Sequence, residues 1–156
     1  METEKRSGKS LVVHTCEIQG KLPGLNDYTD ACRRSKFEGA KMKKDAQIQI
    51  SWFLHRLPEI KRPVKIYFLW QEKDHRRDPD NVSFAQKFIL DELVRLRKIP
   101  NDTGRWIRGL YHSFIYGDSY QVQLTIIEDN NDTERSTHSG DAKVRRGNRK
   151  DRITEA

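Results

Sequence analysis

Asp78 and Asp80, separated by a single proline, stand near the middle of the chain. Carboxylates at positions i and i+2 of a turn can share a hard divalent cation, because Mg²⁺ and Ca²⁺ prefer oxygen ligands. Arg76 and Arg77 precede the pair and Lys87 follows it, and such cations suit a substrate that carries phosphate. The segment therefore indicates metal-assisted phosphodiester chemistry.

The same residues could also do no more than start a helix. Asp78 would then be the N-cap, Pro79 the first helical residue, and Asp80 an acid placed favourably in the dipole field. Capping alone, however, does not call for two arginines before the turn, so we treat the pair as a candidate metal site.

Residues further along the chain can join this pair. If one helix runs over 79–98, the 100° step per residue places Lys87 and Asp91 within about 20° of Asp80 around its axis. Lys87 and Asp91 could equally form an ordinary i, i+4 ion pair. Asp102 follows the proline that ends the helix and can return toward the turn, unless it serves only a turn-forming Asn-Asp pair.

Composition favours an anionic partner. The chain has 156 residues, enough for one domain, and 30 Lys and Arg against 23 Asp and Glu give a formal charge of +7. Nucleic acid is the leading candidate, although a solvated basic surface is the alternative. Cys16 and Cys32 are too few for a disulfide framework, and no secretory or membrane-spanning segment is present. We therefore expect a soluble, cytoplasmic protein, in a bacterial host cell or associated with the nucleoid.

Hydrophobic periodicity and turn residues predict an α+β fold in a single domain, with the order β-α-β-α-β-β and a mixed sheet covered by two main helices. A tight hairpin at 117–119 is expected to join the last two strands. The predicted strands are 11–18, 64–70, 107–116 and 120–128, and the predicted helices are 28–54 and 79–98. Residues 1–10 are expected to form a flexible N-terminus and residues 129–156 a disordered charged tail, which leaves 11–128 as the folded domain.

Three short segments taken together resemble a known family. Arg-Asp-Pro-Asp-Asn at 77–81, Gln-Lys with the following Asp-x-Leu within 86–93, and Asn-Asp at 101–102 resemble the RusA family of Holliday-junction-resolving endonucleases, especially its phage and prophage versions. The Leu-Pro-Gly-Leu-Asn segment at 22–26 is similar to that family's early Leu-Pro and Asn segment. The resemblance covers about residues 11–128.

The resemblance implies specific roles. Asp78, Asp80 and Asp102 would be the carboxylates that bind Mg²⁺, with Mn²⁺ as a substitute, and Lys87 would be the essential catalytic lysine. The protein would be a homodimer that resolves four-way DNA junctions by paired nicks. One departure concerns Lys87, which follows the second aspartate by seven residues, whereas in the founding bacterial version the lysine follows by one helical turn. An extra helical turn would keep Lys87 on the same face.

Affinity for DNA is expected to come from phosphate contacts, although each basic segment could also be an ordinary solvated face. The candidate DNA-binding residues are Asn26, Arg33, Arg34, Lys36, Arg76 and Arg77. A candidate dimer surface combines residues 114–116 with Val122, Leu124 and Ile126.

The sequence thus predicts a metal-dependent, structure-selective endodeoxyribonuclease. The alternative is a basic module that binds branched or single-stranded nucleic acid without cutting it. A metal-dependent glycosyltransferase could also use an Asp-x-Asp pair, but no nucleotide-binding half-domain precedes the motif and the chain is short.

Overall fold

The computed structural model describes residues 10–130, so 1–9 of the predicted N-terminus and 131–156 of the predicted charged tail lie outside the described residues. Four strands and four helices follow one another along the described chain. They are β1 (Val13–Gln19), α1 (Leu25–Arg34), α2 (Lys36–Leu54), β2 (Val64–Glu72), α3 (Pro79–Ser83), α4 (Gln86–Arg95), β3 (Ile107–Tyr116) and β4 (Gln121–Glu128).

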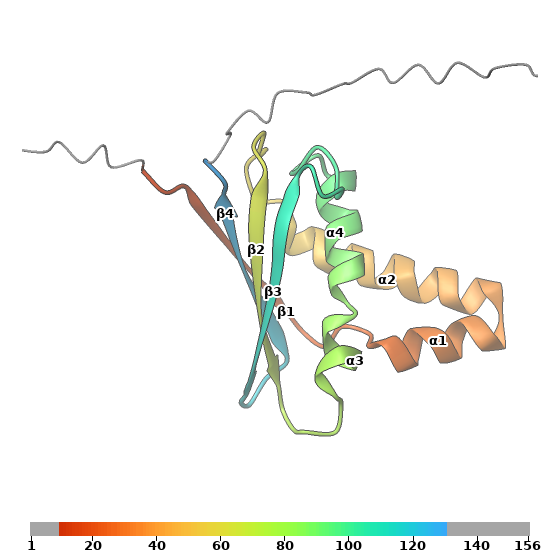
Figure 1. The fold of residues 1–156 in the computed structure, drawn as a ribbon. Coiled ribbons are helices and arrows are strands. Elements are labelled where there is room, and N and C mark those ends of the chain that lie inside the picture. The colour runs from red at the N-terminus through yellow and green to blue at the C-terminus, as the bar shows by residue number, and fades with distance from the viewer. Residues whose placement is uncertain (1–9, 131–156) are drawn as a thin grey trace, which may run out of the picture.

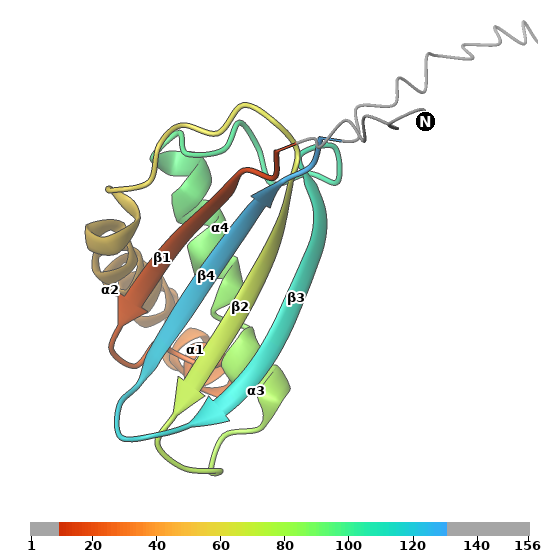
Figure 2. The same ribbon diagram turned by 90° about the vertical axis from the view of Figure 1, so that its left-hand side faces the viewer.

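The strands form one mixed sheet in the order β1-β4-β2-β3. β4 is antiparallel to both β1 and β2, and β2 is parallel to β3. All the helices lie on one face of the sheet, and the other face is uncovered by the described part of the chain (Figures 1 and 2). The predicted α+β fold with a mixed sheet in one domain is therefore confirmed.

The predicted hairpin between the last two strands is wrong, because β2 lies between β3 and β4. The connection crosses the end of β2, where the Gly117 amide donates a hydrogen bond to the Glu72 carbonyl over 2.9 Å. Strands two positions apart in a sheet are separated by about 9.5 Å. The chain from Tyr116 to Gln121 takes five steps and reaches at most about 17 Å, so this short loop can cross one strand as well as close a hairpin.

The hydrophobic core fills the space between the sheet and the helices. Ile50 of α2 and Ile89 and Leu93 of α4 are fully buried there. Val122, Leu124 and Ile126 of β4 belong to the same core, with exposed fractions of 1% or less. These three residues therefore cannot form the predicted dimer surface, because alternate residues of β4 point toward the helices.

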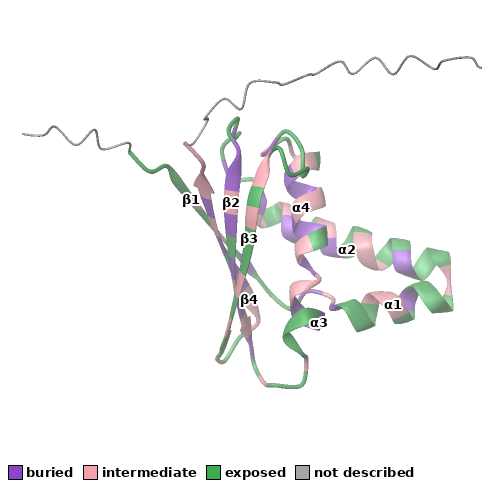
Figure 3. Cartoon of the chain, in the orientation of Figure 1, coloured by how far each residue is buried: buried purple, intermediate pink, exposed green. Residues whose placement is uncertain are grey.

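Each of the two predicted helices is divided in two. Ser35 has extended backbone angles between α1 and α2, and its hydroxyl accepts a hydrogen bond from the Glu38 amide over 3.1 Å. The chain reverses there, so α1 and α2 form a hairpin that projects away from the sheet, with buried Gly39 against Cys32 (Figure 1). Much of the outer part of this hairpin is exposed (Figure 3).

The second division lies between α3 and α4. The Ala85 amide donates to the Val82 carbonyl over 3.3 Å, and the Lys87 amide donates to the Phe84 carbonyl over 3.0 Å, so the chain tightens to i, i+3 bonds. The step of 100° per residue does not continue through such a turn. The predicted angle of about 20° between Asp80 and Lys87 therefore does not apply.

Within residues 10–130, no helix is both long enough and apolar enough to cross a bilayer.

Candidate active site

Asp78 and Asp80 lie at the start of α3, in a turn that follows the carboxyl end of β2; we call this pair the carboxylate turn. Asp78 has extended backbone angles and Pro79 opens the helix, as the helix-start interpretation requires. The Asp78 side chain nevertheless makes no capping hydrogen bond. Both aspartates are exposed, and neither carboxylate has a hydrogen bond or ion pair with the described residues. Their oxygens are therefore available to a ligand.

A buried asparagine holds the carboxylate turn in place. Asn81 is 9% exposed, and its Oδ1 accepts a hydrogen bond from the Asn26 amide over 2.9 Å. A Cβ atom on Gly24 would lie 2.4 Å from the same oxygen, so the backbone at Gly24 approaches Asn81 as closely as only glycine allows. The segment 22–26 is thus packed directly against the carboxylate turn, and Asn26 lies beside it.

Arg77 ties the same two segments together. Its guanidinium forms two hydrogen bonds with the Glu72 carboxylate and donates a third, of 2.8 Å, to the Leu22 carbonyl. Both side chains are largely buried, with exposed fractions of 13% for Arg77 and 7% for Glu72. A bidentate arginine with a buried carboxylate partner is a structural element. Although Arg77 was predicted to bind DNA, in this arrangement its guanidinium makes three hydrogen bonds within the protein.

Other cations gather near Arg77, which directly precedes the carboxylate turn in the chain. The Lys21 and Lys73 ammonium groups lie 5.2 Å and 5.5 Å from the centre of the Tyr120 ring, and Arg77 lies over the same ring. Arg76 is 89% exposed, with Asp74 at 3.5 Å as its partner. We call Lys21, Lys73 and Arg76 the basic rim.

Lys21, Lys73 and Tyr120 were not predicted from the sequence as site residues. Lys21 follows β1, Lys73 follows β2, and Tyr120 precedes β4. The register places the ends of β1 and β2 beside the start of β4, because Gln121 pairs with both Gln19 and Gln71. The sequence shows that each of these residues lies next to the end of a strand. Whether they lie near one another depends on the order of the strands in the sheet, and the predicted hairpin between β3 and β4 gave the wrong order.

Lys87 belongs to a second group of charges, which joins α2 to α4. Asp91 accepts hydrogen bonds from Lys87 over 3.0 Å and from Lys43 of α2 over 3.1 Å. The hydrogen bond with Asp91 is the main cause that raises the pKa of Lys87, and the Asp102 charge adds to it. Asp102, in the exposed segment between α4 and β3, is therefore within electrostatic range of Lys87. We call Lys43, Lys87 and Asp91 the lysine cluster.

The Asp91 carboxylate is only 19% exposed, and two opposing effects act on its pKa. Burial raises the pKa, but the hydrogen bonds from Lys87 and Lys43 outweigh it, so the pKa of Asp91 is lower than usual. Asp91 stays ionised and neutralises one of the two lysines. The lysine cluster therefore carries one net positive charge.

Aromatic side chains occupy the bend between α3 and α4. Tyr28 of α1 stacks on Phe84 with ring centres 5.6 Å apart and meets the edge of Phe88 at 5.5 Å. A hydrogen bond with Cys32 is the main cause that raises the pKa of Tyr28. Phe84 thus anchors the bend between α3 and α4 to α1. This contact is a structural role for the longer spacing between Asp80 and Lys87.

A half-buried histidine fixes the start of α4 next to Lys87. The Trp70 indole N–H donates to His112 Nδ1 over 3.0 Å, so that nitrogen must be an acceptor. The proton then resides on Nε2, which donates to Gln86 Oε1 over 3.0 Å. Burial lowers the pKa of His112, which favours this neutral form.

The described residues do not assemble the predicted ligand set of three aspartates. Among residues 10–130, no group of three or more His, Cys, Asp or Glu side chains is arranged to hold a metal ion. Asp102 instead lies within electrostatic range of Lys87. Asp78 and Asp80 alone suit a Mg²⁺ ion that keeps several waters, since such ions commonly use one or two protein carboxylates and substrate phosphates.

The predicted DNA-binding residues of the helical hairpin gather near its end. Arg33 is 78% exposed with Asp30 3.7 Å away, and Arg34 pairs with Glu38. Lys36 is exposed and has no ion pair with any described residue. These cations therefore face solvent at a distance from the core.

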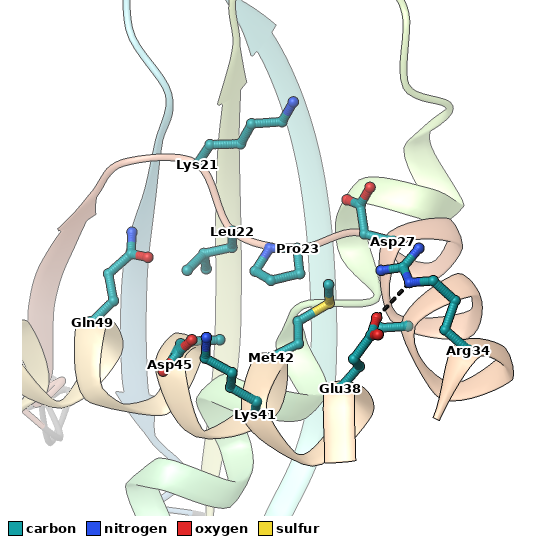
Figure 4. A pocket seen from close by; sticks show the side chains of 12 residues that line it. Lys21, Leu22, Pro23, Asp27, Arg34, Glu38, Lys41, Met42, Asp45 and Gln49 are labelled. Atoms are coloured by element: carbon teal, nitrogen blue, oxygen red, sulfur yellow. Dashed lines mark hydrogen bonds and ion pairs between the residues drawn. The ribbon is translucent and has the colours of Figure 1, made fainter. Parts of the chain in front are cut away.

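A cavity of about 600 Å³ lies between the segment 21–23 and the helices α1 and α2 (Figure 4). Neither aspartate of the carboxylate turn lines it. Its charged lining consists of three cations and three acids, namely Lys21, Arg34, Lys41, Asp27, Glu38 and Asp45. This balance does not favour a polyanion, so the cavity is not part of the candidate active site.

No protein-family model matches the chain, and no curated protein is significantly similar to it in sequence. A function has to be argued from the residues and their arrangement.

Proposed function

We propose that this protein is a Mg²⁺-dependent, structure-selective endodeoxyribonuclease of the RusA type, which resolves Holliday junctions by hydrolysing phosphodiester bonds. One observation carries the proposal. Within the described residues, two exposed carboxylates without a hydrogen-bond or ion-pair partner stand on a turn that buried contacts of Asn81 and Arg77 hold in place, and Lys21 and Lys73 of the basic rim share the Tyr120 ring with Arg77, the residue next to Asp78. Free acids beside cations suit a site where a metal ion and a phosphate meet.

Asp78 and Asp80 are the residues that would hold the metal ion. When bound, Mg²⁺ would offset the repulsion between the acids and the phosphate and make a bound water more acidic. The basic rim would bind the phosphates on either side of the cut. Lys87, a flexible point charge, would neutralise charge that develops on the phosphoryl oxygens.

Asp102 is the third carboxylate of the proposed set. Because the described residues do not group three acids, sharing an ion with Asp78 and Asp80 requires Asp102 to move toward them. We expect Asp102→Asn to reduce cleavage as severely as Asp80→Asn does. Cleavage at the wild-type rate by Asp102→Asn would remove Asp102 from the set.

Resolution of a four-way junction requires two nicks, so the proposal includes a homodimer with two-fold symmetry. The uncovered face of the sheet is the surface we assign to this contact. It carries the stacked pair Tyr67 and Tyr111, whose ring centres are 4.5 Å apart, and exposed Ile115. Sedimentation equilibrium should give a dimer for the wild type and a monomer for Tyr111→Arg; a dimer in both would place the contact elsewhere.

The test of the nuclease is direct. Purified protein, Mg²⁺ and a synthetic four-way junction are mixed, and wild type is compared with Asp80→Asn and with Asp45→Asn, which changes an exposed acid of α2. We expect Asp80→Asn to lower the rate about a hundredfold or more, because it removes a ligand of the proposed ion, and Asp45→Asn to leave it unchanged. Equal cleavage by wild type and Asp80→Asn, or no cleavage by a folded wild type, would contradict the proposal.

The described residues hold no group of three metal-binding side chains, and this observation favours a second candidate function. In that case the protein is a basic module that binds branched or single-stranded DNA without cutting it. Junction binding that is equally tight with and without divalent ions, and unchanged in Asp78→Asn, would support this function.

A further inference from the structure

Phe37 stands at the outer end of the α1–α2 hairpin and is 87% exposed, more than any other large hydrophobic residue that the structure describes. Figure 1 shows this end as the part of the helical layer that projects farthest from the sheet. Three cations closely precede Phe37 in sequence, namely Arg33, Arg34 and Lys36. We call Arg33, Lys36 and Phe37 the hairpin tip.

The local structure directs Phe37 outward. Ser35 fixes the start of α2 through its hydrogen bond with the Glu38 amide, and buried Gly39 faces α1. Phe37 precedes Gly39 by two residues, which is about 200° around the helix, so it lies on the side opposite α1. Neither the core nor α1 uses this side chain.

The charges at the hairpin tip suit a polyanion. Lys36 has no ion pair with any described residue, and Arg33 is 78% exposed with a single acid 3.7 Å away. An aromatic ring together with phosphate-binding cations is the combination with which proteins hold DNA where base faces are exposed. Intact duplex stacks its bases on one another, whereas a branch point leaves base-pair faces that an aromatic side chain can cover.

The hairpin tip is within reach of DNA bound at the carboxylate turn. α1 starts beside Asn81, where the Asn26 amide donates to the Asn81 side chain, and it runs outward for 10 residues. Ten residues of helix span about 15 Å. Four to five nucleotide steps of about 3.4 Å cover the same distance.

We propose that Phe37 stacks on an exposed base pair at the branch point of DNA, while Arg33 and Lys36 bind the phosphates next to it. The hairpin tip then distinguishes branched from linear DNA, a task separate from the chemistry at the carboxylate turn. The inference depends on the proposed function for the nature of the DNA, but not on cleavage.

The test measures binding in the presence of Ca²⁺ in place of Mg²⁺, so that binding is read without depending on cleavage. Dissociation constants for a synthetic four-way junction and for a linear duplex of the same sequence are determined with the full-length wild type and with Phe37→Ala, Phe37→Tyr and Trp52→Ala. Trp52 is the matched control, because it is a 79% exposed aromatic residue farther along α2.

We expect Phe37→Ala to weaken junction binding about tenfold and to leave duplex binding unchanged, since loss of one stacked base contact has an effect of this size. Phe37→Tyr and Trp52→Ala should bind like wild type. A wild type without preference for the junction, an equal effect of Phe37→Ala on both DNAs, or no effect on either would overturn the inference. So would a Phe37→Ala variant with a changed oligomeric state and normal DNA binding, because the tip would then contact a second copy. A protein that prefers junctions through Phe37 but does not cut them would refute only the nuclease.

Discussion

Asp91→Asn tests whether the lysine cluster joins α2 to α4. The variant keeps the size of the side chain but removes the charge that accepts hydrogen bonds of 3.0 Å from Lys87 and 3.1 Å from Lys43. Both lysines are partly exposed, so solvent screens each pair to about 0.5 kcal/mol. We expect the free energy of unfolding to fall by about 1 kcal/mol at pH 7, which lowers Tm by about 3–5 °C for a domain of this size.

The effect should depend on pH in a defined direction. Because the pKa of Asp91 is lower in the folded protein than its ordinary value, its ionised form stabilises the fold above pH 4, and this contribution is lost as the pH falls through the folded-state pKa. The neutral Asn side chain cannot show this loss. The difference between wild type and Asp91→Asn should therefore be present at neutral pH and shrink in acid.

Urea denaturation at several pH values measures these differences. Asp45→Asn is the control, as an exposed aspartate of α2 without an ion pair to the described residues. A double-mutant cycle with Lys43→Met should give a coupling free energy of about 0.5 kcal/mol that decreases in high salt. A loss in Asp91→Asn that is the same at acid and neutral pH, or no coupling with Lys43, would refute the electrostatic reasoning.

Three other substitutions test the packing around the site. Gly24→Ala should lower the free energy of unfolding by about 1–3 kcal/mol in urea denaturation, because its Cβ would meet the Asn81 side chain and carbonyl. Gly104→Ala is the control and should leave the free energy of unfolding unchanged, because there is open space around Gly104. Equal effects of the two substitutions would contradict this account. Ser35→Ala should cost about 1 kcal/mol through loss of the α2 cap, whereas Ser35→Asp should not, and thermal unfolding will distinguish them. Neutral His112 stabilises the fold above its unfolded pKa of about 6.5, and this stability is lost as the pH falls through the lower folded-state pKa. His112→Gln should therefore reduce the dependence of the free energy of unfolding on pH below about 7. An unchanged dependence would argue against this role.

Local patterns in the sequence predicted most of the elements but not how the strands pair. β3 spans the predicted 107–116, and the predicted strand 64–70 lies within β2. The prediction of a hairpin between β3 and β4 was wrong because a short loop with glycine can join two adjacent strands or cross the end of one intervening strand. Only the packing of a whole sheet decides between these, since β4 has to bury its apolar face beside β2.

The candidate site was only partly predictable, because local sequence does not report contacts between distant segments. The carboxylate turn and its position after a strand follow from consecutive residues. Contacts between segments distant in the chain do not, and these include Arg77 with Leu22 and Lys43 with Asp91. They show that Arg77, predicted to bind DNA, has a structural partner, and that Lys87 lies in a cluster with a residue of α2. The hydrophobic periodicity of residues 79–98 did not predict that the helix divides at Phe84. The contact that Phe84 makes is with Tyr28 of another helix, and the pattern within one segment does not report such a contact.

The central claim is that Asp78 and Asp80 hold a divalent ion at the start of α3. A crystal grown with Mn²⁺ and measured near the manganese absorption edge tests it most directly, because the anomalous signal locates the ion itself. We predict a peak within coordination distance of both carboxylates, about 2.1–2.3 Å from an oxygen of each. Strong anomalous peaks elsewhere on the molecule, with none between Asp78 and Asp80, would contradict the account.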